Sequence, residues 1–264
     1  MKLKDYTSAQ ERAWDEIAPV HKGSQFETLL SNFKQPGYSC LDAVETDIWQ
    51  KLNIRGKSVI QLACNNGREI LSVKNLGAGR CVGIDISGEF IKQGRELAQA
   101  GHIECELERM DVYDIPESYN QQFDMVYITI GAMCWMPDLN KFFDVIVRLL
   151  KTGGHLFIYD THPILGMYSA QDTRDVPEPD LSYFLAEPFL DQETCDYYTH
   201  KPQEKASPRW WFQHKLSDVF EAGLTHNMAV VSFKEYPHDV GVFSAWENKK
   251  IQFPLSYSLI LRKD

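Results

Sequence analysis

Between residues 57 and 160, short runs of β-branched and apolar residues alternate with amphipathic stretches that begin at turn residues. This alternation is the pattern of βαβ units, which place parallel strands in one sheet and helices on its faces. It predicts strands at 58–63, 80–86, 104–110, 123–129 and 155–160, and helices at 67–76, 87–100 and 139–150. The chain is therefore expected to be an α/β protein with a mostly parallel sheet.

Two segments fall outside this regular pattern. Residues 1–52 read as amphipathic helices, with Ala9, Trp14 and Ile17 on one face of the first, and are expected to cover a domain formed by residues 53–264. Residues 161–213 hold half of the 12 prolines and read as an insertion with strands at 195–200 and 209–213. A helix at 214–222 and strands at 228–235 and 255–261 complete the prediction. Residues 1–52 are expected to pack against the sheet, and a lid is the alternative.

The charge and the cysteines limit the partners and the compartment. The 27 Lys and Arg residues against 37 Asp and Glu residues give a net charge of -10, which disfavours nucleic acid as a partner. The six cysteines show no zinc-ligand spacing, so we expect reduced thiols, no metal site and a cytoplasmic protein. The longest apolar run is too short to span a bilayer, and no export signal is recognised. The sequence does not determine the oligomeric state.

The first predicted strand runs directly into Cys64-Asn65-Asn66-Gly67 and then into a helix. A tight turn of this kind exposes backbone N–H groups at the sheet edge where nucleotides bind. Gly67 allows a positive φ angle or the close approach of a ligand, although a simple turn glycine is the alternative. The second strand ends at Asp85, whose carboxylate is placed to accept from ribose hydroxyls or, less specifically, to cap the next helix.

A second acid, Asp111, ends the third strand, followed by Val112. Asp111 is suited to accept from an adenine amino group while Val112 supplies a backbone N–H; taken alone, it is equally a turn acid. Thr129 ends the fourth strand, and the Gly153-Gly154 pair makes the reversal into the fifth. The ordered set predicts a nucleoside ligand at the carboxyl ends of the strands.

These motifs resemble those of the class I S-adenosylmethionine-dependent methyltransferases, whose Rossmann-like fold is a seven-stranded sheet with an antiparallel last strand. The resemblance spans roughly residues 55–263. Where the family has an acid and then Gly-x-Gly-x-Gly, this chain has Gln61, Ala63, Asn65 and Gly67, so only the last glycine matches. The run from Cys134 to Leu139 is similar to a branch whose first loop is likewise rich in Cys and Asn.

The resemblance implies S-adenosyl-L-methionine as cofactor and S-adenosyl-L-homocysteine as product. It implies these cofactor contacts: Tyr6, Ala63, Asn65, Gly67, Asp85, Ile86, Asp111, Val112 and Thr129. Methyl transfer is an in-line displacement, so alignment in a dry pocket is the main requirement, and an alcohol acceptor also needs a base. His162, just past the fifth strand, is the candidate base, with a structural histidine as the alternative.

Aromatic side chains are the candidates for the acceptor site: Trp14 and His21 in the N-terminal helices, Trp135 after the fourth strand, and Tyr168 in the insertion, with core packing as the alternative for each. A small-molecule acceptor is expected, with residues 1–52 and 161–213 as the cover on its side. Residues 161–213 hold nine acids and four bases, a local charge of -5, which favours a neutral or cationic acceptor over a polyanion. An NAD-dependent oxidoreductase would need glycines at 63, 65 and 68, where the chain has Ala, Asn and Arg. A catalytically silent cofactor-binding module stays open because of the altered first loop.

Overall fold

A computed structural model describes residues 1–172, 174–191 and 207–264. Its helices of eight or more residues are α1 (Leu3–Phe33), α2 (Ala43–Lys51), α3 (Arg68–Asn75), α4 (Gly88–Ala100), α5 (Leu139–Leu149) and α6 (Leu216–Thr225). Its strands are β1 (Val59–Leu62), β2 (Cys81–Asp85), β3 (Glu106–Arg109), β4 (Phe123–Thr129), β5 (Leu150–Thr161), β6 (Phe189–Asp191), β7 (Arg209–Trp211), β8 (Met228–Tyr236) and β9 (Ser256–Lys263).

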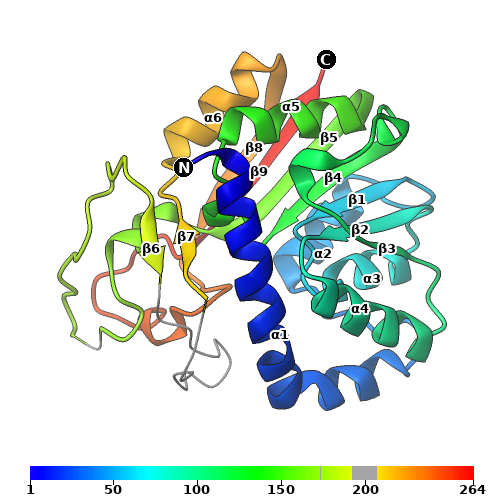
Figure 1. The fold of residues 1–264 in the computed structure, drawn as a ribbon, viewed down its shortest axis with the longest axis horizontal. Helices are drawn as coiled ribbons and strands as arrows, with labels where there is room; N and C mark the ends of the chain where they lie inside the picture. The colour runs from blue at the N-terminus through cyan, green and yellow to red at the C-terminus, as the bar shows by residue number, and fades with distance from the viewer. Residues whose placement is uncertain (173, 192–206) are drawn as a thin grey trace.

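Seven of these strands form one sheet in the order β3-β2-β1-β4-β5-β9-β8 (Figure 1). The pairs from β3 to β5 are parallel, whereas β9 is antiparallel to both β5 and β8. The predicted mostly parallel sheet with an antiparallel last strand is therefore confirmed. The order reverses direction between β1 and β4, and this switch point is where ligands bind in open α/β sheets.

Alternate strand residues face opposite sides of the sheet, and both sides are buried. On one side Val59 and Tyr127 pack with residues of α2, α3 and α4, including the fully buried Trp49. On the other, Ile60 and Val126 pack against α5 and α6. Strands buried on both faces appear in the sequence as continuous apolar runs. The predicted positions of β1 and β4 therefore agree closely with the structure.

The long helix α1 lies across the carboxyl edge of the sheet. Figure 1 shows it running between the main sheet and the small β6–β7 ribbon. Asp15 of α1 accepts from the Ser87 hydroxyl at 2.7 Å, next to the start of α4, and Glu16 accepts from Ser207 at 2.7 Å, next to β7. These polar contacts attach the middle of α1 to both neighbours.

The predicted elements of the sheet core are found within a few residues of their expected ends. β5 begins earlier than predicted because Leu150 already pairs with Phe123, and the register then shifts across the Gly153-Gly154 turn until His155 pairs with Met125. The predicted strand at 209–213 is β7, but its partner β6 was not predicted. The strand predicted at 195–200 lies outside the described residues. No helix in the described ranges is long and apolar enough to cross a membrane.

Candidate active site

A cavity of about 670 Å³ opens at the carboxyl ends of β1, β2, β4 and β5. This volume lies within the range of small-ligand pockets. Its walls come from the β1–α3 loop, the ends of β2 and β3, the segment after β4, the segment after β5, and α1 and the β6–β7 ribbon above them. The cavity therefore joins the predicted cofactor edge to the two segments outside the regular core.

The β1–α3 loop has a left-handed backbone at the three positions where the family pattern has glycine. The φ angles are 53° at Ala63, 52° at Asn65 and 68° at Gly67. Asn tolerates this region better than most residues, whereas Ala carries a steric cost there. Gly67 precedes α3, and a Cβ on it would lie 2.9 Å from Leu107 Cδ2. The loop thus keeps its turns despite the two missing glycines.

Asp85 lies at the end of β2, beside this loop, and is 8% exposed. Its Oδ2 accepts from the Asn65 backbone N–H at 2.7 Å and its Oδ1 accepts from the Ser87 backbone N–H at 2.9 Å. Burial raises the pKa of the Asp85 carboxyl to about 7, and the two N–H donors oppose that rise. The carboxylate and the neighbouring Ile86 both face the cavity, as expected for a ribose-binding position.

Asp111 and Val112, just past β3, also line the cavity. The Asp111 Oδ1 accepts from the Tyr113 backbone N–H at 3.1 Å. Its Oδ2 lies 3.1 Å from the ammonium of Lys4, which also reaches Asp114 at 2.6 Å. The start of α1 is therefore attached to the carboxylate that we expected on the adenine side.

Thr129, at the end of β4, lines the cavity and accepts from the Gln61 side-chain amide at 2.9 Å. Gln61 is fully buried beneath it and does not reach the cavity wall. The Gln61 amide therefore holds Thr129 in place. Position 61 is the one at which the family pattern has an acid.

Asp160, at the end of β5, is a cavity carboxylate that was not among the predicted site residues. Its oxygens accept from the backbone N–H groups of Gly131, of Thr161 at 2.7 Å and of Met133 at 3.3 Å. Burial raises the pKa of Asp160 to about 6. An acid at the carboxyl end of a parallel strand was the signal used for Asp85 and Asp111, and it applies equally to Asp160.

His162 lines the cavity but uses both ring nitrogens inside the protein. Its Nδ1 accepts from the Ile164 backbone N–H at 3.1 Å, and its Nε2 lies 3.0 Å from a Glu235 carboxylate oxygen. Because Nδ1 is an acceptor, the proton of the neutral ring is on Nε2 and points to Glu235. Burial lowers the pKa of His162 and Glu235 opposes this effect.

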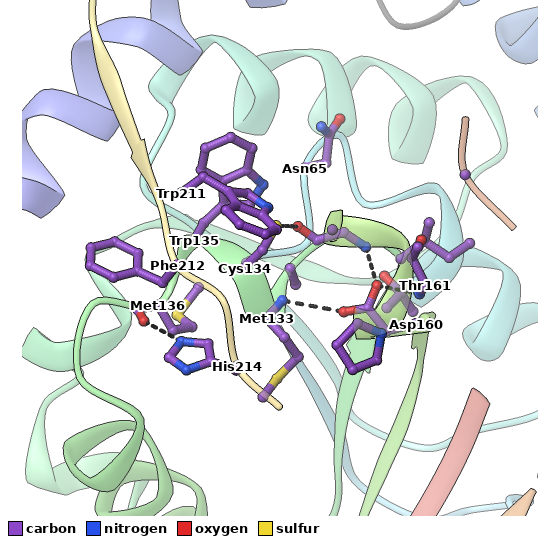
Figure 2. Close-up of a pocket in the computed structure, with 18 of the residues that line it drawn as sticks. Asn65, Met133, Cys134, Trp135, Met136, Asp160, Thr161, Trp211, Phe212 and His214 are labelled. Carbon is purple, nitrogen blue, oxygen red and sulfur yellow. Dashed lines mark hydrogen bonds between the residues drawn. The ribbon is translucent and has the colours of Figure 1, made fainter. Parts of the chain in front are cut away.

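Aromatic side chains enclose the far part of the cavity. Trp14 of α1 and Trp135 of the segment after β4 meet edge to face, with centroids 5.1 Å apart. Figure 2 shows Trp135 and Trp211 together on one side and Asp160 with Thr161 on the other. Tyr168 of the insertion also contributes to the wall. Three of the four predicted acceptor-site residues are thus brought together.

Three predicted residues are not in this cavity wall. Tyr6 packs against Trp210 and Phe212 with centroids 5.6 and 5.2 Å apart, and Gly67 serves the turn. His21 packs against Phe90 at 5.8 Å and borders a second cavity of about 410 Å³.

The predicted site residues also omitted Arg209 and Asp191 of the β6–β7 ribbon, which line the cavity. Charged residues in a proline-rich segment carry no periodic signal that places them inward. Among the described residues, no group of three or more His, Cys, Asp or Glu side chains is arranged to hold a metal ion.

A doubly wound sheet with one antiparallel strand between β5 and β8, and acids at the ends of β2 and β3, defines the class I methyltransferase fold. Residues 59–154 match the family described as a methyltransferase domain. This segment of the chain is therefore similar to a methyltransferase domain, in agreement with the fold.

Individual relatives are distant. The chain is 25% identical over 164 residues to the methyltransferase phqN of Penicillium fellutanum, covering 56% of this chain and 49% of that protein. It is 31% identical over 105 residues to the ribosomal protein L11 methyltransferase of Serratia proteamaculans, covering 40% and 34%. The chain thus spans half or less of the length of these curated relatives.

A solved S-adenosylmethionine-dependent methyltransferase from Clostridium acetobutylicum superimposes with a TM-score of 0.57 at 14% identity, covering 95% of this chain and 98% of that one. This likeness supports the fold.

Proposed function

We propose that the protein transfers a methyl group from S-adenosyl-L-methionine to a small-molecule acceptor. The observation that carries this proposal is the single cavity that joins Asn65, Asp85 and Asp111 to the aromatic chamber around Trp14 and Trp135. A donor at one end and an acceptor at the other would share one enclosed space, which is what an in-line displacement requires.

The residues present fit the cofactor. Asp85 and Asp111 offer carboxylate acceptors to ribose and adenine, Val112 offers its backbone, and the β1–α3 loop leaves room through its left-handed turns. When bound, S-adenosyl-L-methionine supplies an electrophilic methyl group on a sulfonium. The protein's own task is to hold the acceptor in line with that group and to exclude water.

The enclosed acceptor end supports a small acceptor. Helix α1 and the β6–β7 ribbon both contribute walls there, and the aromatic side chains offer large apolar surfaces. The distant relatives include an enzyme named for ribosomal protein L11, so relationship alone does not select the acceptor. The cytoplasmic location stays a prediction.

The geometry favours Asp160 over His162 as the group that would take a proton from a hydroxyl acceptor. Among the described residues, the Asp160 Oδ2 accepts one hydrogen bond, from Met133, while both His162 nitrogens are engaged. A carboxyl pKa near 6 also suits a base at neutral pH. His162 would then position Ile164 and the segment after β5.

Calorimetry with S-adenosyl-L-methionine, S-adenosyl-L-homocysteine and NAD tests the proposal. We expect both sulfur nucleosides to bind and NAD not to bind. Replacing Asp85 with Ala should weaken nucleoside binding by on the order of 1–3 kcal/mol, the scale of hydrogen bonds to a charge. Asp47→Ala, on an exposed part of α2, is the matched control and should leave binding unchanged.

Turnover separates an enzyme from a silent cofactor-binding module. A labelled methyl donor incubated with the protein and a metabolite extract should yield a labelled small molecule. Nucleoside binding without any labelled product would favour the silent module, and stronger binding of NAD would reject the family function altogether.

A further inference from the structure

The acceptor end of the cavity holds one arginine, Arg209 of β7, which is only 8% exposed. Its guanidinium carbon lies 4.9 Å from the ring centroid of Trp14 and 5.0 Å from that of Trp135. The two indole rings therefore cover the cation and hold it in place. A rigid scaffold thus presents this charge to the chamber.

Some of the N–H groups of Arg209 make no hydrogen bond to the described part of the chain. The Nε atom donates to Asp191 Oδ2 at 2.8 Å. Neither terminal nitrogen of Arg209 donates a hydrogen bond within the described part of the chain. Neither of these nitrogens is among the fully buried side-chain atoms without a partner, so both keep some solvent contact in the cavity and are available to a ligand. The open fork matches the two oxygens of a carboxylate.

On the basis of the proposed methyl transfer, we propose that the acceptor is an aromatic organic acid whose carboxylate pairs with Arg209. Trp14, Trp135 and Trp211 supply ring surfaces next to the guanidinium, and Phe189 adds another. The acidic insertion favoured a neutral or cationic acceptor on sequence grounds. Arg209 nevertheless places a cation in the cavity wall; Asp191 of the same ribbon pairs with its Nε, and the two terminal nitrogens face no other acid of the described residues within ion-pair distance.

The geometry also separates this anion site from the donor end. Asp85 ends β2 and Asp111 follows β3, whereas Arg209 lies on the β6–β7 ribbon, which Figure 1 shows on the other side of α1 from the main sheet. A carboxylate near either acid would be repelled. Pairing with Arg209 instead directs the rest of the acceptor toward the middle of the cavity.

Paired ligands that differ only in charge test the proposal. The full chain is saturated with S-adenosyl-L-homocysteine and titrated with 4-hydroxybenzoate, 4-hydroxyphenylacetate and indole-3-acetate, and with the primary amide of each. Calorimetry and tryptophan fluorescence report binding. At least one acid should bind about 10- to 100-fold more tightly than its amide, the effect of a hydrogen-bonded charge.

Variants assign the preference to Arg209. Arg209→Gln should abolish the difference between acid and amide, and Arg209→Lys, which keeps the charge but not the fork, should retain part of it. Arg80→Gln is the matched control, because Arg80 pairs with Glu106 outside the cavity. If Arg209→Gln does not fold by circular dichroism, the Lys variant decides: an unchanged preference in that variant contradicts a bidentate site.

The outcomes distinguish the two proposals. Failure of S-adenosyl-L-homocysteine to bind rejects the proposed function and this inference with it. Normal nucleoside binding combined with equal affinities for acids and amides, or with no saturable binding of any acid, rejects the anion site alone. A preference that persists in Arg209→Gln also overturns it.

Discussion

The ammonium of Lys4 lies 3.1 Å from the Asp111 carboxylate, so the first turn of α1 is attached to the acid expected to contact adenine. The same ammonium reaches the exposed Asp114 at 2.6 Å. Two neighbouring carboxylates therefore share one lysine, but only Asp111 lines the cavity.

This arrangement provides a matched pair of variants. Asp111→Ala should weaken binding of S-adenosyl-L-homocysteine by on the order of 1–3 kcal/mol, because a hydrogen bond to a charge is lost. Asp114→Ala removes a partner of the same lysine and should leave binding within about 0.5 kcal/mol, as expected for an exposed ion pair. Calorimetry measures both. Equal losses in the two variants would show that Asp111 acts only through Lys4.

The left-handed backbone of the loop predicts that glycine is favoured at both position 63 and position 67. Ala63→Gly should stabilise the fold by about 0.5–1 kcal/mol, because the steric cost of a Cβ at positive φ exceeds the added chain entropy. Gly67→Ala should destabilise it by at least about 1 kcal/mol, since the Cβ also meets Leu107. Urea unfolding gives both free energies.

Gly23 of α1 is the control for these loop variants, because its φ is not positive and a Cβ there meets nothing within 4 Å. Gly23→Ala should stabilise the protein by about 0.5–1 kcal/mol through helix propensity. A Gly67→Ala variant as stable as Gly23→Ala would contradict the strained turn.

The buried Glu45 of α2 should make the free energy of unfolding depend on pH. Burial raises its pKa to about 7, and the Tyr127 hydroxyl, which donates to it, opposes that rise. A carboxyl whose pKa is higher in the folded state stabilises the fold when protonated, and that contribution is lost as the pH rises through about 4 to 7. Glu45→Gln should therefore gain on the order of 2 kcal/mol relative to wild type between pH 4 and pH 8.

Unfolding in urea at pH 4, 6 and 8 measures this gain. Asp47→Asn, on the exposed part of the same helix, is the control and should follow the wild-type curve. A Glu45→Gln curve parallel to wild type across the whole range would mean that Glu45 does not hold its proton in the folded state.

Turnover measurements distinguish Asp160 from His162 as the candidate base. On an acceptor with a hydroxyl group, Asp160→Asn should lower kcat by about 10²- to 10⁴-fold and remove the acidic limb of the pH profile near pH 6. His162→Gln should lower stability through loss of the Glu235 and Ile164 contacts but keep that limb. Loss of the limb in His162→Gln alone would restore His162 as the base.

The sequence was informative where strands are buried on both faces. The positions of β1 and β4, and the placing of Asp85 and Asp111 at one sheet edge, follow from apolar runs that end in turn residues. The small ribbon was predicted only in part, because β6 is three residues long and partly exposed. A strand as short as β6, which pairs only with β7 in the described part of the chain, has no local sequence pattern that predicts it.

The directions in which side chains point could not be predicted from the sequence either. The sequence places His162 beside the site, but only the structure shows that its Nε2–H donates a hydrogen bond to Glu235, 73 residues later. Arg209 became part of the site through Trp14 and Trp135, which come from two distant segments. Such groupings depend on tertiary packing and have no signature in residue spacing.

Helix α1 contacts Asp111 through Lys4 and lines the proposed acceptor chamber through Trp14. Because one continuous helix borders both halves of the cavity, a shift of its first turn is carried to the aromatic wall. Under the proposed function, substitutions in α1 should therefore change donor binding and acceptor binding together.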